Sequence, residues 1–220
     1  MKRALVSFLL LIGCAVGAEM PVVVFDFGGV LGGTDKTVLV EELEVCFGIS
    51  EKEAWEVLSE LRTAKSQGQT AGQFWSLCAE ARGWELPSDW MQYIERVRLH
   101  AIRANEEMYR LVAQLRQQKV QVAILSNVSP YRAKYIRACG LYDLFEPVLL
   151  SCEVGLEKPD EKIFLLMLDR IGKEPNQCIF IDDKLRNIRV AKQLGMDTIH
   201  FRSPSQLKEE LCKREVLHCS

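Results

Sequence analysis

The feature that most constrains the fold is a regular alternation of short apolar runs with amphipathic segments in the second half of the chain. Runs rich in β-branched and aromatic residues occupy 120–125, 147–150, 178–181 and 198–201, and an earlier run lies at 22–25. Short apolar runs separated by helix-length segments are typical of parallel strands joined by helical crossovers. The sequence therefore predicts an α/β fold with a doubly wound, parallel, five-stranded sheet.

Two pairs of residues predict helix starts in this region. Ser129 precedes Pro130, and Lys158 precedes Pro159. Proline is favoured in the first turn of a helix because its missing N–H would have no partner there. We therefore expect one helix to begin at each pair.

A long insertion separates the first predicted strand from the second. Residues 34–103 read as helical without a convincing strand, and Ser50 with Glu53 forms a capping box. We predict a helical cap domain at 34–103, inserted into an α/β core formed by 19–33 and 104–220. The hinge residues expected between the two parts are Gly32, Gly33, Ala104 and Asn105.

Two aspartates lie just beyond separate apolar runs. Asp26 follows the run at 22–25, and Asp183 follows the run at 178–181. If these runs are neighbouring parallel strands, both carboxylates lie at one edge of the sheet. A concentrated negative site of this kind favours a divalent cation, or a phosphorylated substrate together with its metal. The pair therefore indicates a phosphoryl-transfer centre.

The composition is that of a globular protein and gives no sign of a nucleic-acid surface. Of 220 residues, 48% are apolar and 26% are charged, and the formal net charge is −2. No run of Lys and Arg is longer than a pair. Nucleic acid is therefore not an expected partner. The eight cysteines contain no Cys-x-x-Cys pair and predict no disulfide framework.

The first residues resemble a secretory signal peptide. Lys2 and Arg3 precede an apolar run at 4–13, which is too short to span a membrane comfortably. We predict a signal peptide at 1–18 and export to the periplasm or the extracellular space. A lipoprotein anchored through Cys14 and a cytoplasmic protein starting at Met20 are the alternatives. Membrane association is expected only through such an N-terminal signal or lipid anchor.

Four motifs in order resemble those of the haloacid dehalogenase superfamily, whose hydrolases form an aspartyl phosphate. They are Asp26-Phe-Gly-Gly-Val-Leu31, Ile124-Leu-Ser-Asn127, Glu157-Lys-Pro-Asp160 and Phe180-Ile-Asp-Asp183. The resemblance extends over essentially the whole chain from Val22 to Phe201. It implies a Rossmann-like core with a helical cap, phosphatase activity and a Mg²⁺ cofactor.

The resemblance also assigns roles to individual residues. Asp26 matches the nucleophile and Lys158 the catalytic lysine, which pairs with both the nucleophile and the phosphate. The implied substrate-binding residues are Phe27, Gly28, Ser126, Asn127 and Lys158. The implied metal ligands are Asp26, the carbonyl of Gly28, Asp183 and, less directly, Asp182. Taken singly, each motif is also typical of an ordinary turn or helix start. Asn187 is either an orienting partner of Asp183 or an ordinary residue on a helix face.

One position departs from the family pattern. Most phosphatases of this family have a second aspartate two residues after the nucleophile, which acts as general acid and base, and here Gly28 stands there. Loss of a positioned acid costs about 10²- to 10⁴-fold in rate. Related sequences with glycine at this place include sugar-phosphate phosphatases, so the departure does not imply an inactive protein.

The sequence leads to one favoured function and two alternatives. The favoured function is a magnesium-dependent phosphatase acting on a small phosphorylated metabolite, for which a sugar phosphate is one candidate. The first alternative is haloacid dehalogenation, which needs no metal and leaves Asp182 and Asp183 unexplained. The second is a non-catalytic binding protein, which the glycine at position 28 suggests. The oligomeric state and the identity of the substrate are not readable from the sequence.

Overall fold

The computed structural model describes residues 20–218. The predicted signal peptide at 1–18 and the alternative anchor Cys14 lie outside the described residues, so export stays a prediction. Within 20–218, no helix is both long enough and apolar enough to span a bilayer. Cys46, Cys78, Cys139, Cys152 and Cys178 are free thiols, whereas Cys212 is disulfide-bonded.

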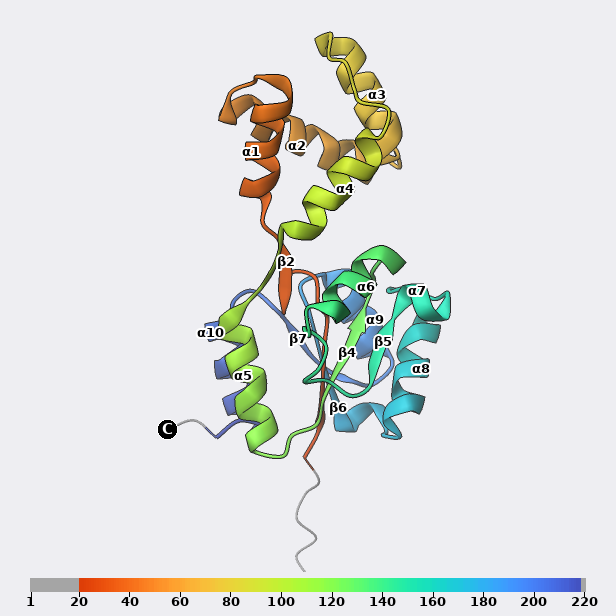
Figure 1. Ribbon diagram of the computed structural model, residues 1–220. Coiled ribbons are helices and arrows are strands. Elements are labelled where there is room, and N and C mark those ends of the chain that lie inside the picture. The colour runs from red at the N-terminus through yellow and green to blue at the C-terminus, as the bar shows by residue number, and fades with distance from the viewer. Residues whose placement is uncertain (1–19, 219–220) are drawn as a thin grey trace, which may run out of the picture.

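The central sheet has five strands in the order β5-β4-β1-β6-β7 (Figure 1). Every neighbouring pair in this order is parallel. The strands are β1 (Val22–Phe25), β4 (Val122–Ser126), β5 (Val148–Leu150), β6 (Cys178–Asp182) and β7 (Asp197–His200). All five strands coincide with the predicted apolar runs to within two residues at either end. The predicted fold class is therefore confirmed.

Helices cover both faces of this sheet because both faces of its strands are apolar. In β1, Val23 and Phe25 point into one hydrophobic core, while Val22 and Val24 point into another. Three helices pack on the first core: α5 (Glu106–Gln117), α6 (Pro130–Ala138) and α10 (Pro204–Lys213). Two helices pack on the second core: α8 (Glu161–Ile171) and α9 (Leu185–Gln193). Two short elements complete this part: α7 (Ser151–Val154) and the 3₁₀ helix η1 (Pro175–Gln177).

One predicted helix start is confirmed and the other is wrong. Helix α6 begins at Pro130, and the Ser129 side chain accepts a hydrogen bond from the third residue of the helix. Helix α8 begins only at Glu161, with Asp160 as its N-cap. Lys158 lies in the loop before it, because its side chain and backbone are held in the buried site described below.

The insertion forms a separate helical layer with a hydrophobic core of its own (Figure 1). Its helices are α1 (Lys36–Phe47), α2 (Glu51–Ser66), α3 (Ala71–Arg82) and α4 (Trp90–His100). The predicted capping box of Ser50 and Glu53 starts α2. Trp75 and Trp90 are buried in the core of this layer, and Trp55 is exposed.

The two connections between this layer and the sheet are paired with each other, which the sequence did not indicate. Strand β2 (Gly32–Thr34) runs antiparallel to β3 (Ile102–Ala104), with Gly32 opposite Ala104 and Gly33 opposite Arg103. The expectation of no strand up to residue 103 is therefore wrong. Short glycine-containing strands carry little pattern of their own, and only their mutual backbone hydrogen bonds define them.

Candidate active site

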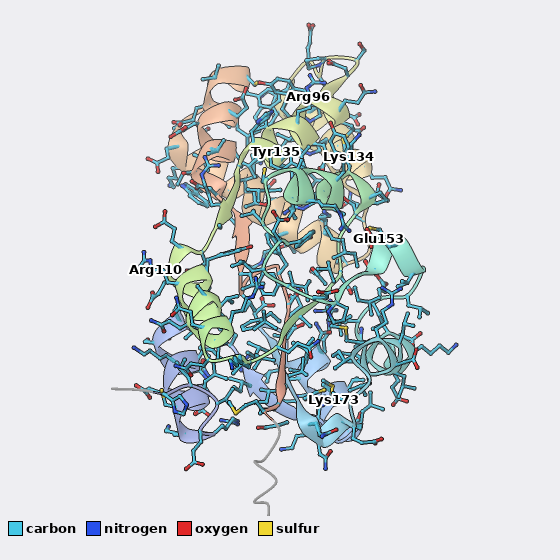
Figure 2. All side chains as sticks on the ribbon, turned by 60° about the horizontal axis from the view of Figure 1, so that its bottom comes forward. Arg96, Arg110, Lys134, Tyr135, Glu153 and Lys173 are labelled. Atoms are coloured by element: carbon cyan, nitrogen blue, oxygen red, sulfur yellow. The ribbon has the colours of Figure 1, made fainter. Side chains whose placement is uncertain are left out.

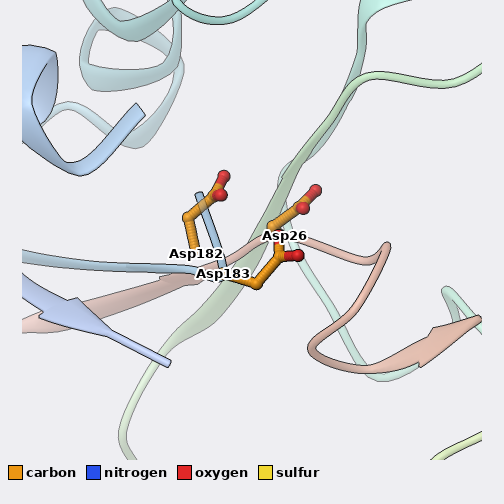
Figure 3. A group of neighbouring side chains, drawn as sticks. All are labelled: Asp26, Asp182 and Asp183. Atoms are coloured by element: carbon orange, nitrogen blue, oxygen red, sulfur yellow. The ribbon is translucent and has the colours of Figure 1, made fainter. Parts of the chain in front are cut away.

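The carboxyl ends of the three central strands bring the predicted site residues together. Phe25 pairs with Ile124 of β4 and with Ile181 of β6, so the next residues along these strands meet at one edge. One carboxylate oxygen each from Asp26, Asp182 and Asp183 lie within 4.8 Å of one another (Figure 3). Residues more than 150 positions apart therefore converge on one acidic centre, as the strand pattern predicted.

Lys158 neutralises part of this charge from within the protein. Its side chain is buried, and its Nζ lies 3.0 Å from Oδ1 of Asp26 and 2.7 Å from Oδ2 of Asp182. The same ammonium donates a hydrogen bond of 2.7 Å to the carbonyl of Leu125. All three contacts are short and enclosed, so the cation is held beside Asp26 in one geometry.

The carboxylate of Asp182 is occupied by hydrogen bonds within the protein. Its Oδ2 accepts from Lys158 and, at 2.8 Å, from Nδ2 of the buried Asn187. Its Oδ1 accepts from the backbone N–H of Lys184 at 2.8 Å. Asp182 therefore mainly holds Lys158 in place. The suggested contact of Asn187 with Asp183 is wrong, because the Asn187 amide binds Asp182.

Asp183 differs from Asp182 in having an unused oxygen. Its Oδ1 is buried without a hydrogen-bond partner, and the nearest cationic group is the partly exposed Nζ of Lys184 at 3.8 Å. A Cβ at Gly29 would lie 2.7 Å from Oδ2 of Asp183, so only glycine leaves room for this carboxylate. The ring of His200 is hydrogen-bonded to the Asp183 carbonyl at 3.1 Å.

These groups suit a magnesium ion. Mg²⁺ prefers oxygen ligands and is usually bound by one or two carboxylates together with water and substrate phosphate. Asp26, Asp182 and Asp183 each bring one carboxylate oxygen to the same centre, and Oδ1 of Asp183 has no hydrogen-bond partner within the protein. The residues present therefore fit the cofactor that the sequence predicted.

Burial makes the charge of Asp26 costly. The pKa of Asp26 is raised above its ordinary value because the side chain is buried, and the nearby negative charge of Asp182 raises it further. The positive charge of Lys158 acts in the opposite direction but does not outweigh the burial. The site therefore carries more negative charge than the protein alone compensates, and an added cation would relieve it.

The two residues at the end of β4, Ser126 and Asn127, have different surroundings. Ser126, the last residue of the strand, is buried at the site edge. The Asn127 side chain binds the backbone of Lys158, accepting from its N–H at 2.9 Å and donating to its carbonyl at 2.8 Å. Within the protein the Asn127 side chain thus fixes the loop that holds Lys158, and its predicted contact with phosphoryl oxygens stays a prediction.

The loop after Asp26 presents its backbone groups, more than its side chains, to the site. The ring of Phe27 is buried and packs edge-on against Tyr142, so contact of Phe27 with a substrate is limited to its main chain. Its carbonyl accepts hydrogen bonds from the N–H groups of Val30, Leu31 and Gly32. No atom lies within 4 Å of the position that a Cβ would take at Gly28. The space that the side chain of a general acid at position 28 would enter is therefore open.

Two supporting contacts could not be assigned from the sequence. His200 reaches the Asp183 carbonyl only because β7 lies beside β6, with His200 opposite Asp182. Asn127 was found by its motif, but its pairing with Lys158 depends on the approach of two loops 31 residues apart. No local pattern signals either contact.

Comparison with known proteins gives consistent results. The sequence profile described as haloacid dehalogenase-like hydrolase matches residues 20–195. Bifunctional epoxide hydrolase 2 of Sus scrofa is 32% identical over 142 residues, covering 62% of this chain but only 26% of that protein. The chain thus spans about a quarter of that relative's length.

Two further comparisons cover nearly the whole chain. D-ribitol-5-phosphate phosphatase of Bacteroides thetaiotaomicron is 26% identical over 207 residues, covering 86% of this chain and 95% of that protein. A solved structure from Bacteroides thetaiotaomicron, an enzyme of the same family in complex with magnesium and inorganic phosphate, is 25% identical with a TM-score of 0.56. That comparison covers 86% of this chain and 99% of the other.

Proposed function

Because the chain belongs to the haloacid dehalogenase-like hydrolase family, we propose that it is a magnesium-dependent phosphatase that acts on a small phosphorylated metabolite. The observation that carries this proposal is the group formed by the buried Asp26 and Lys158 with the partly buried Asp183, whose Oδ1 has no hydrogen-bond partner. The similarity to a ribitol-phosphate phosphatase supports a sugar phosphate as one candidate substrate.

The proposed reaction has two displacements at phosphorus. A carboxylate oxygen of Asp26 attacks the phosphorus atom, and the bond from phosphorus to the alcohol oxygen breaks. Water then attacks the aspartyl phosphate, which releases inorganic phosphate and restores the Asp26 carboxylate. The alcohol oxygen takes its proton from water, since no acidic side chain stands at position 28.

Charge repulsion is the main obstacle to the first displacement. A carboxylate and a phosphate dianion about 4 Å apart repel by roughly 8 kcal/mol at an effective dielectric of 20. Lys158 offsets part of this repulsion because its ammonium lies beside the attacking carboxylate. When bound, Mg²⁺ supplies the remaining positive charge at the phosphoryl oxygens. The residues that would hold it are Asp26, Asp183 and the carbonyl of Gly28, with Asp182 nearby.

An assay of phosphate release from an aryl phosphate tests the proposal. We expect activity with Mg²⁺, loss of activity in a chelator, and a fall of about 10³-fold or more in Asp26→Asn, since removal of a nucleophile removes the main reaction path. Asp169→Asn, which changes an exposed carboxylate on α8, is the matched control and should be fully active. Chloride release from a haloacid in the presence of chelator, without phosphatase activity, would contradict the proposal.

A further inference from the structure

Asp183 is the carboxylate of the acidic centre that the protein encloses least. Its side chain is 35% exposed, whereas the side chains of Asp26 and Asp182 are almost fully buried. It also lies between two regular elements, because β6 ends at Asp182 and α9 begins at Leu185. Contacts from other parts of the chain must therefore hold this residue in place at the centre.

The peptide unit that joins Asp183 to Lys184 is held at both of its polar ends. Its N–H, from Lys184, donates a hydrogen bond of 2.8 Å to Oδ1 of Asp182. Its carbonyl, from Asp183, lies 3.1 Å from Nε2 of His200. A peptide unit is planar and includes the Cα atoms on both sides, so these two contacts fix the plane from which the Asp183 side chain projects.

Within residues 20–218, the ring of His200 is the only hydrogen-bond partner of this carbonyl. No backbone N–H of these residues donates to it, since the N–H groups of Asn187 and Ile188 donate to the carbonyl of Lys184 instead. A carbonyl oxygen accepts, so Nε2 of His200 must carry a proton. Both the neutral ring protonated on Nε2 and the charged ring meet this condition, so the contact does not depend on the charge of the ring.

The sheet places His200 where its ring can reach the Asp183 carbonyl. His200 is the last residue of β7 and lies opposite Asp182 of the parallel neighbour β6. The next residue, Phe201, continues the pairing, since its N–H donates a hydrogen bond of 3.0 Å to the Asp182 carbonyl. The half-buried ring therefore projects from a paired strand and not from a loop, which allows it to hold the peptide unit in one orientation.

We propose that His200 is a positioning residue for the metal site, which orients the Asp183 carboxylate for a divalent cation by holding the peptide unit between Asp183 and Lys184. The proposal rests on the proposed magnesium-dependent function, in which Asp183 is a metal ligand. Loss of a group that orients a metal ligand lowers metal affinity by about 10- to 100-fold. Because the peptide unit keeps its second hydrogen bond, to Asp182, we expect the lower end of this range.

Binding of Mg²⁺ alone, without substrate, tests the proposal. The melting temperature of each protein is followed as Mg²⁺ is added after treatment with chelator, and its rise gives an apparent dissociation constant. We expect His200→Phe, which keeps a ring but lacks the N–H donor, to raise this constant about tenfold. His200→Leu removes the donor with a different shape and should give the same result, so a folding defect in one variant does not decide the test.

Two further variants show whether the N–H donor is responsible. His200→Gln restores an N–H donor near the position of Nε2 and should recover most of the affinity for Mg²⁺. His100→Phe is the matched control, since it makes the same substitution at a histidine whose ring lies edge-on to that of Tyr135, with centroids 5.9 Å apart (Figure 2). It should bind Mg²⁺ as the wild type does. Equal dissociation constants in the wild type and the donor-free variants, or an equal loss in His200→Phe and His200→Gln, would overturn the proposal.

Phosphate release from an aryl phosphate separates this proposal from the one on which it rests. In His200→Phe, we expect a higher Mg²⁺ concentration at half-maximal rate, with a rate at saturating Mg²⁺ close to that of the wild type. Mg²⁺ binding that depends on His200, without release from any phosphate ester, contradicts the phosphatase and leaves the positioning role standing. Magnesium-dependent release with the same half-maximal concentration in both proteins supports the phosphatase and contradicts the positioning role.

Discussion

At the scale of single residues, the two adjacent aspartates of the acidic centre have different roles, although the sequence motif contains them as a pair. Asp182 and Asp183 are adjacent, yet Asp182 accepts three hydrogen bonds and Asp183 leaves one oxygen without a partner. Adjacent residues at a strand end face opposite ways, so one carboxylate holds Lys158 and the other is open to a cation. Asp26 contacts the same lysine as Asp182.

Position 28 permits a direct gain-of-function prediction. A side chain fits there, because nothing lies within 4 Å of a Cβ and the backbone is not left-handed. Gly28→Asp would place a carboxyl group two residues after Asp26, where it can protonate the leaving alcohol. We expect hydrolysis of alkyl phosphates to rise by about 10²-fold or more, with little change for aryl phosphates, which leave without an acid.

Steady-state rates with both classes of ester measure this effect. Gly28→Asn has the same shape without the acid and should leave the alkyl phosphate rate low. Equal rates in the aspartate and asparagine variants would show that position 28 cannot supply the proton.

At the scale of elements, the ribbon of β2 and β3 controls how the helical layer is attached. Backbone hydrogen bonds continue past it on both sides, from Asp35 N–H to the Ala101 carbonyl at 2.7 Å and from Asn105 N–H to the Leu31 carbonyl at 2.8 Å. The two connections are thus one paired unit and not two independent flexible loops. Movement of the layer relative to the sheet must bend this unit as a whole.

Substitutions of two glycines of β2 test whether β2 and β3 form one tightly paired unit. A Cβ at Gly32 would lie 2.7 Å from the Arg103 carbonyl oxygen, whereas a Cβ at Gly33 meets nothing within 4 Å. Gly32→Ala should separate the strands and cost about 1–3 kcal/mol in the free energy of unfolding. Thermal melting and steady-state kinetics measure the effect. We expect Gly32→Ala to have a lower melting temperature and a changed kcat, whereas Gly33→Ala should match the wild type in both. A Gly32→Ala protein as stable as Gly33→Ala would exclude a tightly paired ribbon.

At the scale of the whole molecule, function and stability oppose each other at the acidic centre. The fold buries Asp26 and Asp182 with one lysine, Lys158, and places the partly exposed Asp183 beside them. Burying an excess of carboxylates lowers the stability of the metal-free protein, and a bound cation restores it by mass action. Burial of apolar side chains in the two cores on either face of the sheet offsets this loss of stability.

The raised pKa of Asp26 predicts a pH-dependent stability in chelator. The ordinary pKa is 3.8, and a raised value in the folded state means that the folded protein binds the proton more tightly than the unfolded chain. The contribution of Asp26 to stability is therefore complete below 3.8 and is lost as the pH rises through the raised pKa. The side chain in Asp26→Asn resembles the protonated carboxyl group, so we expect the variant to have a higher melting temperature than the wild type at neutral pH. This difference in melting temperature should vanish as the pH falls to 3.8.

Thermal melts of both proteins across this pH range measure the difference. Addition of Mg²⁺ at neutral pH should stabilise the wild type more than Asp26→Asn, because the variant lacks one anionic ligand. A wild type that is the more stable protein at neutral pH in chelator would contradict the sign of the shift.

Local pattern determined much of this protein. The five apolar runs were sufficient to predict the parallel sheet, and parallel strands necessarily bring Asp26 and Asp183 to one edge. The predicted capping signals of α2 and α6 also act within a few residues, so their sequence alone defines them.

Tertiary structure decided the features that depend on contacts between distant segments. The pairing of β2 with β3, the clamp of Asn127 on Lys158 and the contact of Asn187 with Asp182 follow from which loops approach one another. Sequence periodicity reports which face of a segment is buried, but it carries no information on which distant side chain lies opposite, because that depends on the packing of the whole chain.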